Sequence, residues 1–111
     1  MNKQNRYIDI ITKKLRINKS VKDAYVFGSY AYGKPDVDSD IDLLIILNRD
    51  GFLTEYKDRI DYRMNIAKSL YEVNKDIAID ILVYTQKEWE KLLETGSSFH
   101  NEIAGNAVKI L

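Results

Sequence analysis

The chain contains no cysteine and a single proline among its 111 residues. The lack of cysteine excludes disulfides, thiolate catalysis and zinc sites built on thiolates. The formal net charge is zero, because 17 Lys and Arg residues balance 17 Asp and Glu residues. Proteins that bind duplex nucleic acid gain affinity by neutralising many phosphates, so this balance argues against duplex binding. It leaves open the binding of one nucleotide, whose phosphates a metal ion can neutralise.

Long hydrophobic runs are missing as well. No apolar stretch approaches the roughly 20 residues that a membrane-spanning helix needs. The N-terminal segment 1–6 is polar and lacks the apolar core of a signal peptide. We therefore expect a cytoplasmic protein without membrane contact. The length, with 45% hydrophobic and 31% charged residues, predicts one globular domain spanning residues 1–111.

Hydrophobic periodicity divides the chain into helices and strands. Short apolar runs bounded by turn residues predict strands at 21–27, 40–47 and 77–84. Helical spacing predicts helices at 5–17, 53–71, 86–94 and 99–109. The order indicates an α/β (α+β) fold in which helices cover a small mixed sheet of about three strands. Within 53–71 the spacing predicts a buried stripe that consists of Tyr56, Ile60, Met64, Ala67, Leu70 and Tyr71.

A glycine–serine pair, Gly28-Ser29, ends the first predicted strand. Gly28 has no Cβ, so a phosphate can approach the main chain closely there. Ser29 offers a hydroxyl and an amide to phosphate oxygens, and amides of a short helical turn at 30–32 would add to them. Taken alone, Gly-Ser after a strand is usually a plain turn. The Gly-Ser pair indicates a phosphate site only in combination with the residues that follow it.

Ten residues after the Gly-Ser pair, Asp40 and Asp42 flank Ile41 at the start of a very apolar strand. Side chains two residues apart in a strand point the same way, so both aspartates project from one face. Antiparallel pairing of 21–27 with 40–47 would bring Gly28 to the same sheet edge. Asp80 stands alone in the third predicted strand, and it joins the other two if its strand pairs beside theirs.

Three neighbouring carboxylates repel one another, so their proximity requires a physical explanation. Two such charges about 5 Å apart, at an effective dielectric of about 20, repel by about 3 kcal/mol. A divalent cation removes this cost, and Mg²⁺ prefers oxygen ligands that substrate phosphates complete. Two ions are a recurring solution for in-line displacement at phosphorus. Each aspartate has a simpler structural interpretation when it is considered alone. Acidic residues are frequent at the starts of strands, and Asp80 could be a strand residue held in a salt bridge.

The combined pattern resembles the DNA polymerase β-type nucleotidyltransferase superfamily, and the short chain looks most like its minimal nucleotidyltransferase (MNT) group. The residues that carry the likeness are Phe27-Gly28-Ser29, Gly33, the run Ser39–Ile45 and Asp80. Members of that group are often antitoxins paired with HEPN-domain toxins, and some transfer AMP to a tyrosine of the toxin. The resemblance implies a polymerase β-like nucleotidyltransferase fold.

The resemblance also implies roles for individual residues. Asp40, Asp42 and Asp80 would bind metal, and Asp80 would in addition help to deprotonate the incoming hydroxyl. Gly28 and Ser29 would hold the triphosphate. One departure concerns the segment after Gly-Ser, where relatives often carry an arginine.

In this chain Tyr30 and Tyr32 flank Ala31 in that segment. Any contribution of the arginine to phosphate binding must come from Lys34 or be absent. The substitution bears on catalytic strength more than on fold.

We therefore predict an Mg²⁺-dependent nucleotidyltransferase that uses two ions and moves AMP from ATP to a hydroxyl on a HEPN-type toxin. After the third strand only residues 86–111 remain, too few for the helical domain with which small-molecule nucleotidyltransferases bind acceptors. Two alternatives stay open. The chain could be a non-catalytic antitoxin that neutralises a toxin by contact, or the catalytic subunit of a small-molecule enzyme completed by a separate helical subunit. The apolar C-terminal helix leaves homo-oligomer formation open.

Overall fold

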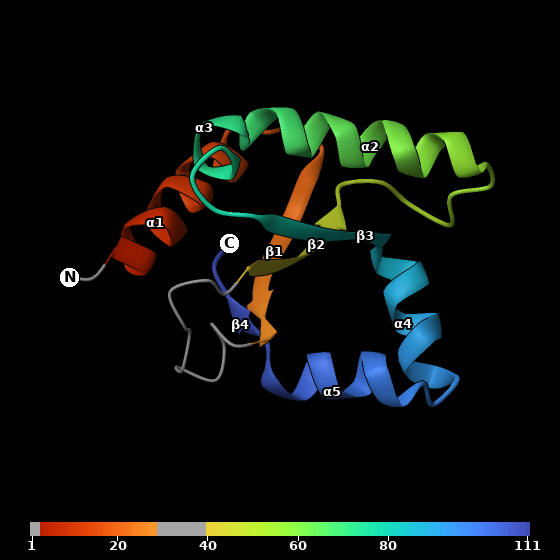
Figure 1. Cartoon of the computed structure of the whole chain (residues 1–111). Helices are drawn as coiled ribbons and strands as arrows, with labels where there is room; N and C mark the ends of the chain where they lie inside the picture. The colour runs from red at the N-terminus through yellow and green to blue at the C-terminus, as the bar shows by residue number, and fades with distance from the viewer. Residues whose placement is uncertain (1–2, 29–39) are drawn as a thin grey trace.

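The computed structural model describes residues 3–28 and 40–111, and the side chains from residue 6 onward within them (Figure 1). The elements in chain order are α1 (Lys3–Arg16), β1 (Val21–Phe27), β2 (Ile41–Leu47), α2 (Tyr56–Ser69), α3 (Tyr71–Asn74), β3 (Ile79–Thr85), α4 (Gln86–Glu94), α5 (Ser98–Asn106) and β4 (Val108–Lys109). No helix among these residues is long and apolar enough to cross a membrane.

The described strands form one mixed sheet in the order β3-β2-β1-β4. Strand β1 runs antiparallel to β2 and to β4, whereas β2 and β3 are parallel. The α/β class and the predicted pairing of the first two strands are thereby confirmed. The sheet has one strand more than predicted, because the last predicted helix ends at Asn106 and the chain then pairs with β1. A strand of two residues shows no periodicity in the sequence.

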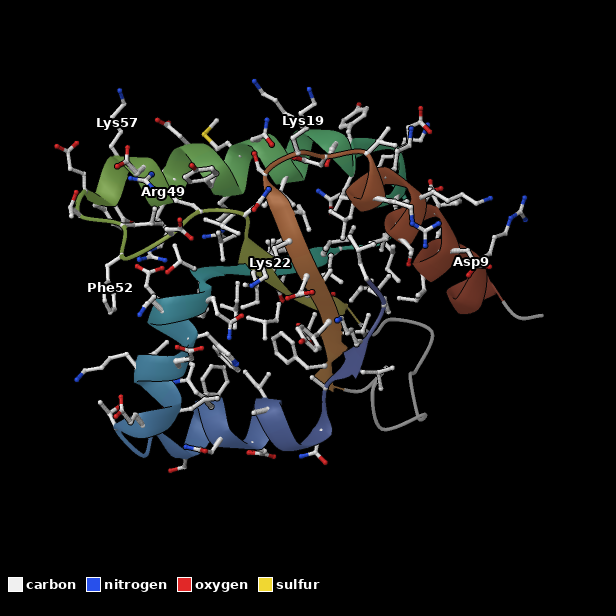
Figure 2. All side chains as sticks on the ribbon, turned by 180° about the vertical axis from the view of Figure 1, so that it is seen from behind. Asp9, Lys19, Lys22, Arg49, Phe52 and Lys57 are labelled. Carbon is white, nitrogen blue, oxygen red and sulfur yellow. The ribbon has the colours of Figure 1, made fainter. Side chains whose placement is uncertain are left out.

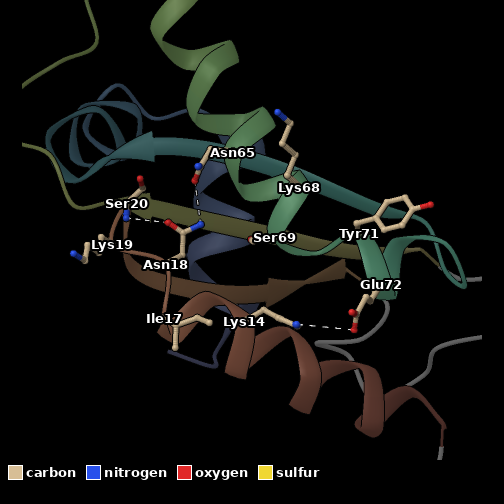
Figure 3. Close-up of a pocket in the computed structure, with 10 residues that line it drawn as sticks. All are labelled: Lys14, Ile17, Asn18, Lys19, Ser20, Asn65, Lys68, Ser69, Tyr71 and Glu72. Carbon is tan, nitrogen blue, oxygen red and sulfur yellow. Dashed lines mark hydrogen bonds and ion pairs between the residues drawn. The ribbon is translucent and has the colours of Figure 1, made fainter.

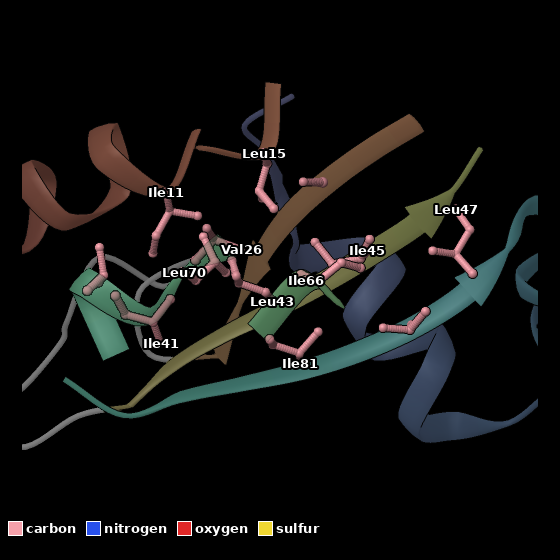
Figure 4. Close-up of a cluster of buried hydrophobic side chains, with 13 residues drawn as sticks. Ile11, Leu15, Val26, Ile41, Leu43, Ile45, Leu47, Ile66, Leu70 and Ile81 are labelled. Carbon is pink, nitrogen blue, oxygen red and sulfur yellow. The ribbon is translucent and has the colours of Figure 1, made fainter. Parts of the chain in front are cut away.

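Helices cover both faces of the sheet, and this explains why β2 is apolar throughout. Alternate β2 residues enter two separate cores. One core lies under α1, α2 and α3 (Figure 4), and its β2 members are Ile41, Leu43, Ile45 and Leu47. The other lies under α4 and α5, with Leu44 and Ile46 packed against Trp89 and Ile103. The first residue of β2 that faces the α4–α5 side is Asp42, where the apolar pattern is broken.

The segment of helix α2 buries only the Ala67 and Leu70 part of the stripe that its periodicity predicts. Ile66 and Leu70 are buried, but Tyr56 is 79% exposed and Met64 is 54% exposed. The predicted stripe is therefore wrong for Tyr56 and Met64, and also for Ile60 and Tyr71, which are exposed too. The helix carries apolar residues on two sides, and periodicity cannot say which side meets the sheet.

A clasp of two charged side chains, Arg59 of α2 and Glu88 of α4, joins the helices across the free edge of β3. Arg59 Nη2 donates to Glu88 Oε2 at 2.6 Å, and Arg59 Nη1 donates to the carbonyl of Val83 at 2.8 Å. The backbone amides of Leu53 and Thr85 also donate to the Glu88 carboxylate, the latter within a capping box that begins α4. The clasp ties three elements and satisfies an outward-facing carbonyl of an edge strand.

Candidate functional site

Two carboxylates meet on neighbouring strands at one edge of the sheet. Asp42 of β2 is the register partner of Asp80 of β3 in the parallel pair. Residues in register on parallel strands lie on the same face, and neighbouring strands are about 4.8 Å apart. Asp42 shares its face with Leu44, so the two acids lie on the side covered by α4 and α5. The condition on which Asp80 joins Asp42, that its strand lies beside the Asp42 strand, is met.

Gly28 lies directly against this pair. It follows β1, whose last residue, Phe27, is the register partner of Asp42. Its φ is +71°, a backbone conformation that residues with a side chain rarely adopt. A Cβ at this position would overlap the Oδ2 atom of Asp42. Glycine is thus required here for two separate reasons, and the main chain approaches a carboxylate closely at the sheet edge.

The electrostatics of Asp42 reflect its surroundings. Partial burial raises the pKa of the Asp42 carboxyl, and the neighbouring charges of Asp80 and Asp40 raise it further. Side-chain hydrogen bonding to Asp80 adds to the effect. Asp42 therefore holds a proton more readily than an isolated aspartate. Placing negative charge here is costly unless a cation compensates it.

Asp40 stands one residue before β2 and is exposed. Its charge acts on Asp42. Among the described residues, no three His, Cys, Asp or Glu side chains are grouped closely enough to hold a metal ion. The donor chemistry of the Asp42–Asp80 pair, two hard oxygen groups with an unfavourable mutual charge, fits a divalent cation. The metal-binding roles of Asp40, Asp42 and Asp80 stay predictions.

Ser29 lies outside the described residues. The same holds for the short helical turn expected at 30–32 and for Lys34. Their predicted contacts with phosphate remain predictions. Gly28 is the part of the proposed phosphate turn that the structure places, and it places it against Asp42.

A pocket that the sequence pattern did not reveal lies beside Gly28. Its volume is about 230 Å³, and its lining consists of Phe27, Gly28, Phe99, Glu102, Ile103 and Asn106. The pattern around Phe99 predicts only a packing residue, yet this side chain is 56% exposed. Helix α5 brings it to the end of β1 from far along the chain, and no local spacing could signal that.

A wider groove of about 760 Å³ lies between α1, α2 and α3 (Figure 3). Asn18 Nδ2 donates to Asn65 Oδ1 at 3.1 Å within it, and Lys14 lies 4.0 Å from Glu72. The groove reaches Ser20, just before β1, whereas Gly28 follows that strand. Seven strand residues span about 20 Å. The groove is therefore separate from the carboxylate pair.

Comparison with known proteins identifies the family to which this arrangement belongs. The family described as "Polymerase beta, Nucleotidyltransferase" matches residues 9–97, which include Gly28, Asp42 and Asp80. The chain belongs to this nucleotidyltransferase family. The resemblance seen in the Gly-Ser and Asp-x-Asp spacing is thereby confirmed, and the matched residues include strands β1, β2 and β3.

A solved structure described as "Crystal structure of the toxin-antitoxin with AMP-PNP" has a similar fold. The TM-score is 0.55 at 22% sequence identity, and the match covers 94% of this nucleotidyltransferase chain and 72% of the other. At this identity the likeness concerns the fold. Among curated proteins no match was found.

Proposed function

We propose that this chain is an Mg²⁺-dependent nucleotidyltransferase that moves AMP from ATP to a hydroxyl on a partner protein, as the MNT-type antitoxin of a HEPN toxin. The observation that carries the proposal is the in-register pairing of Asp42 with Asp80 against Gly28. This juxtaposition combines carboxylate donors with a point of the main chain that carries no side chain. Both are needed to hold a triphosphate through divalent metal.

Each residue has a role in the transfer. Asp42 and Asp80, with Asp40, would hold Mg²⁺, which when bound neutralises the triphosphate and makes the acceptor hydroxyl more acidic. Gly28 carries no side chain that would keep phosphate oxygens from the main chain, and Ser29 would donate its hydroxyl to them. The acceptor oxygen forms a bond to the α-phosphorus while the bond to pyrophosphate breaks. Asp80 accepts the proton of the acceptor, and pyrophosphate leaves.

A protein acceptor is supported by the way in which the last helices are used. Helices α4 and α5 pack Trp89, Leu92 and Ile103 against the sheet. These two helices therefore belong to the core of the sheet rather than to a separate acceptor-binding domain. A fold relative whose description names a toxin–antitoxin pair and a nucleotide analogue points the same way.

The test is to incubate the chain with Mg²⁺, ATP and the product of the neighbouring gene, and then to weigh both proteins intact. We expect the partner to gain the mass of AMP. Asp42→Asn should abolish this adduct, because it removes a carboxylate from the pair. Asp76→Asn is the matched control, since Asp76 is an exposed acid outside β3 and should leave the transfer unchanged.

The segment after Gly-Ser lacks arginine, and this observation favours one alternative: an antitoxin that acts by contact alone. Neutralisation of the toxin that survives Asp42→Asn, without any adduct, would establish that alternative. An adduct on a small molecule, formed only when a second helical subunit is present, would instead establish the small-molecule enzyme. Either result would overturn the proposed transfer to a protein.

A further inference from the structure

We propose that the pocket formed by Phe27, Gly28, Phe99, Glu102, Ile103 and Asn106, here called the α5 pocket, binds the base of the nucleotide. The inference rests on the proposed function and deepens it by assigning the part of the substrate that no carboxylate or phosphate turn can hold. The ligand class is a flat heteroaromatic ring.

The first argument is position. Gly28 lines the α5 pocket and also lies against Asp42. Phe27 lines the pocket and is the register partner of Asp42 across β1 and β2. The pocket therefore opens next to the carboxylate pair. In Figure 1, α5 runs past the end of β1 before the chain turns into β4. One ligand can reach both the pocket and the carboxylates.

The second argument is the chemistry of the lining. Among the described residues that line the pocket there is no lysine or arginine to hold a phosphate. The polyphosphate end of a nucleotide therefore belongs at Gly28 and the aspartates, and the uncharged end belongs in the pocket. Phe27, Phe99 and Ile103 provide the apolar and aromatic surface on which a base stacks.

The third argument is size. Whole drug-sized ligands occupy pockets of about 300–1,000 Å³. At about 230 Å³ the α5 pocket is smaller, and it suits one ring system of a larger ligand. Phe99 is 56% exposed beside it, an aromatic ring that a stacked base would cover.

The experiment compares two probes, Mg-ATP and Mg-tripolyphosphate, by isothermal titration calorimetry. Tripolyphosphate carries the phosphates without a base. Phe99→Ala should weaken ATP binding by roughly 5- to 20-fold, the lower part of the range for base–aromatic stacking. It should leave tripolyphosphate binding unchanged, and Phe99→Tyr should restore ATP binding.

Phe52→Ala is the matched control. Phe52 is 51% exposed, close to the value for Phe99, and it projects from the loop before α2 near the start of α4 (Figure 2). Its removal should leave the binding of both probes as in the original chain. The unliganded melting temperatures of the variants show whether each one folds.

Three results would overturn the inference. Equal ATP affinity before and after Phe99→Ala would place the base elsewhere and leave the proposed function standing. Equal loss for ATP and tripolyphosphate would mean that Phe99 supports the fold of the site rather than the base. Failure of the original chain to bind either probe would overturn the proposed function, and the assignment of the pocket with it.

Discussion

At the scale of single residues, Gly28 connects the backbone of β1 to the chemistry of Asp42. Two requirements coincide at this residue: a positive φ and the absence of a Cβ beside a carboxylate oxygen. Gly51 offers a comparison within the same chain. Its φ is +72°, yet nothing lies within 4 Å of the position that a Cβ would take.

This pair of glycines yields a prediction. Gly28→Ala should lower both the free energy of unfolding and the affinity for Mg-ATP, because Asp42 must move away from the new methyl group. Gly51→Ala should cost only the backbone strain of about 1–2 kcal/mol and leave nucleotide affinity unchanged. Urea denaturation and calorimetry measure the two effects. Similar behaviour of the two variants would mean that Gly28 has no special relation to Asp42.

At the scale of elements, α2 shows that sequence periodicity can predict the wrong residues of a helix to be buried. Its side toward the sheet carries Ile66, which is fully buried, while Met64, two positions earlier, is 54% exposed. Both are large apolar residues in the middle of the same helix. Only contact with the sheet distinguishes them.

A matched pair of substitutions tests this orientation of α2. Ile66→Ala should destabilise the fold by about 2–5 kcal/mol, because it leaves a cavity in the core. Met64→Ala should change the free energy of unfolding by less than about 0.5 kcal/mol, because its side chain is largely in water already. Urea midpoints with unchanged slopes give both values. The reverse order would mean that α2 is turned the other way about its axis.

At the scale of the whole molecule, the Arg59–Glu88 clasp joins the helical layer on one face of the sheet to α4 on the other. Burial would raise the pKa of Glu88, but hydrogen bonds from Arg59, Thr85 and Leu53, together with the charge of Arg59, outweigh it and lower the pKa. The folded state therefore releases this proton more readily than the unfolded chain. The resulting stabilisation is present above the ordinary carboxyl pKa of 4.5 and is lost as the pH falls through the lower folded value.

A substitution at this clasp gives a pH-dependent prediction. Glu88→Gln should cost about 1–3 kcal/mol at neutral pH, because it removes hydrogen bonds to a charged group. The difference from the original chain should shrink as the pH falls below 4.5, because Glu88 takes up a proton in the unfolded chain at a higher pH than in the folded one. Glu90→Gln is the control, since Glu90 lies exposed on the same helix. Unfolding measured across pH decides, and a constant difference at every pH would contradict the assignment.

Local signals in the sequence predicted most of the fold and part of the site. Strand β1 and helix α4 have the predicted bounds, because turn residues and a cap mark their ends. Asp42 and Asp80 each stand in an apolar strand, but whether those strands lie side by side was left open by the sequence and is seen only in the sheet. Helix α5 begins at Ser98, one residue before its predicted start at 99, because Ser97 is the cap and its side chain accepts from the His100 amide. Neighbouring serines offer equivalent caps in a sequence.

The parts that could not be predicted depend on contacts between distant segments. The α5 pocket requires Phe99 to meet Phe27, more than half the chain away. The exposed flank of α2 depends on which of two apolar sides meets the sheet. Strand β4 exists only because Lys109 pairs with Tyr25 of β1. Periodicity describes one element at a time and contains none of these relations.

Strands β2 and β3 are aligned so that Asp42 stands opposite Asp80. This alignment determines which insertions and deletions the site tolerates. Residues between the two strands can be added or removed in the turns around α2 without altering which carboxylates face each other. A one-residue deletion inside β3 is different, because it turns every later side chain to the opposite face of the sheet. Isoleucine would then stand where Asp80 meets Asp42. Homologous chains should therefore vary in the length of the α2 crossover while the count of residues along β3 stays fixed.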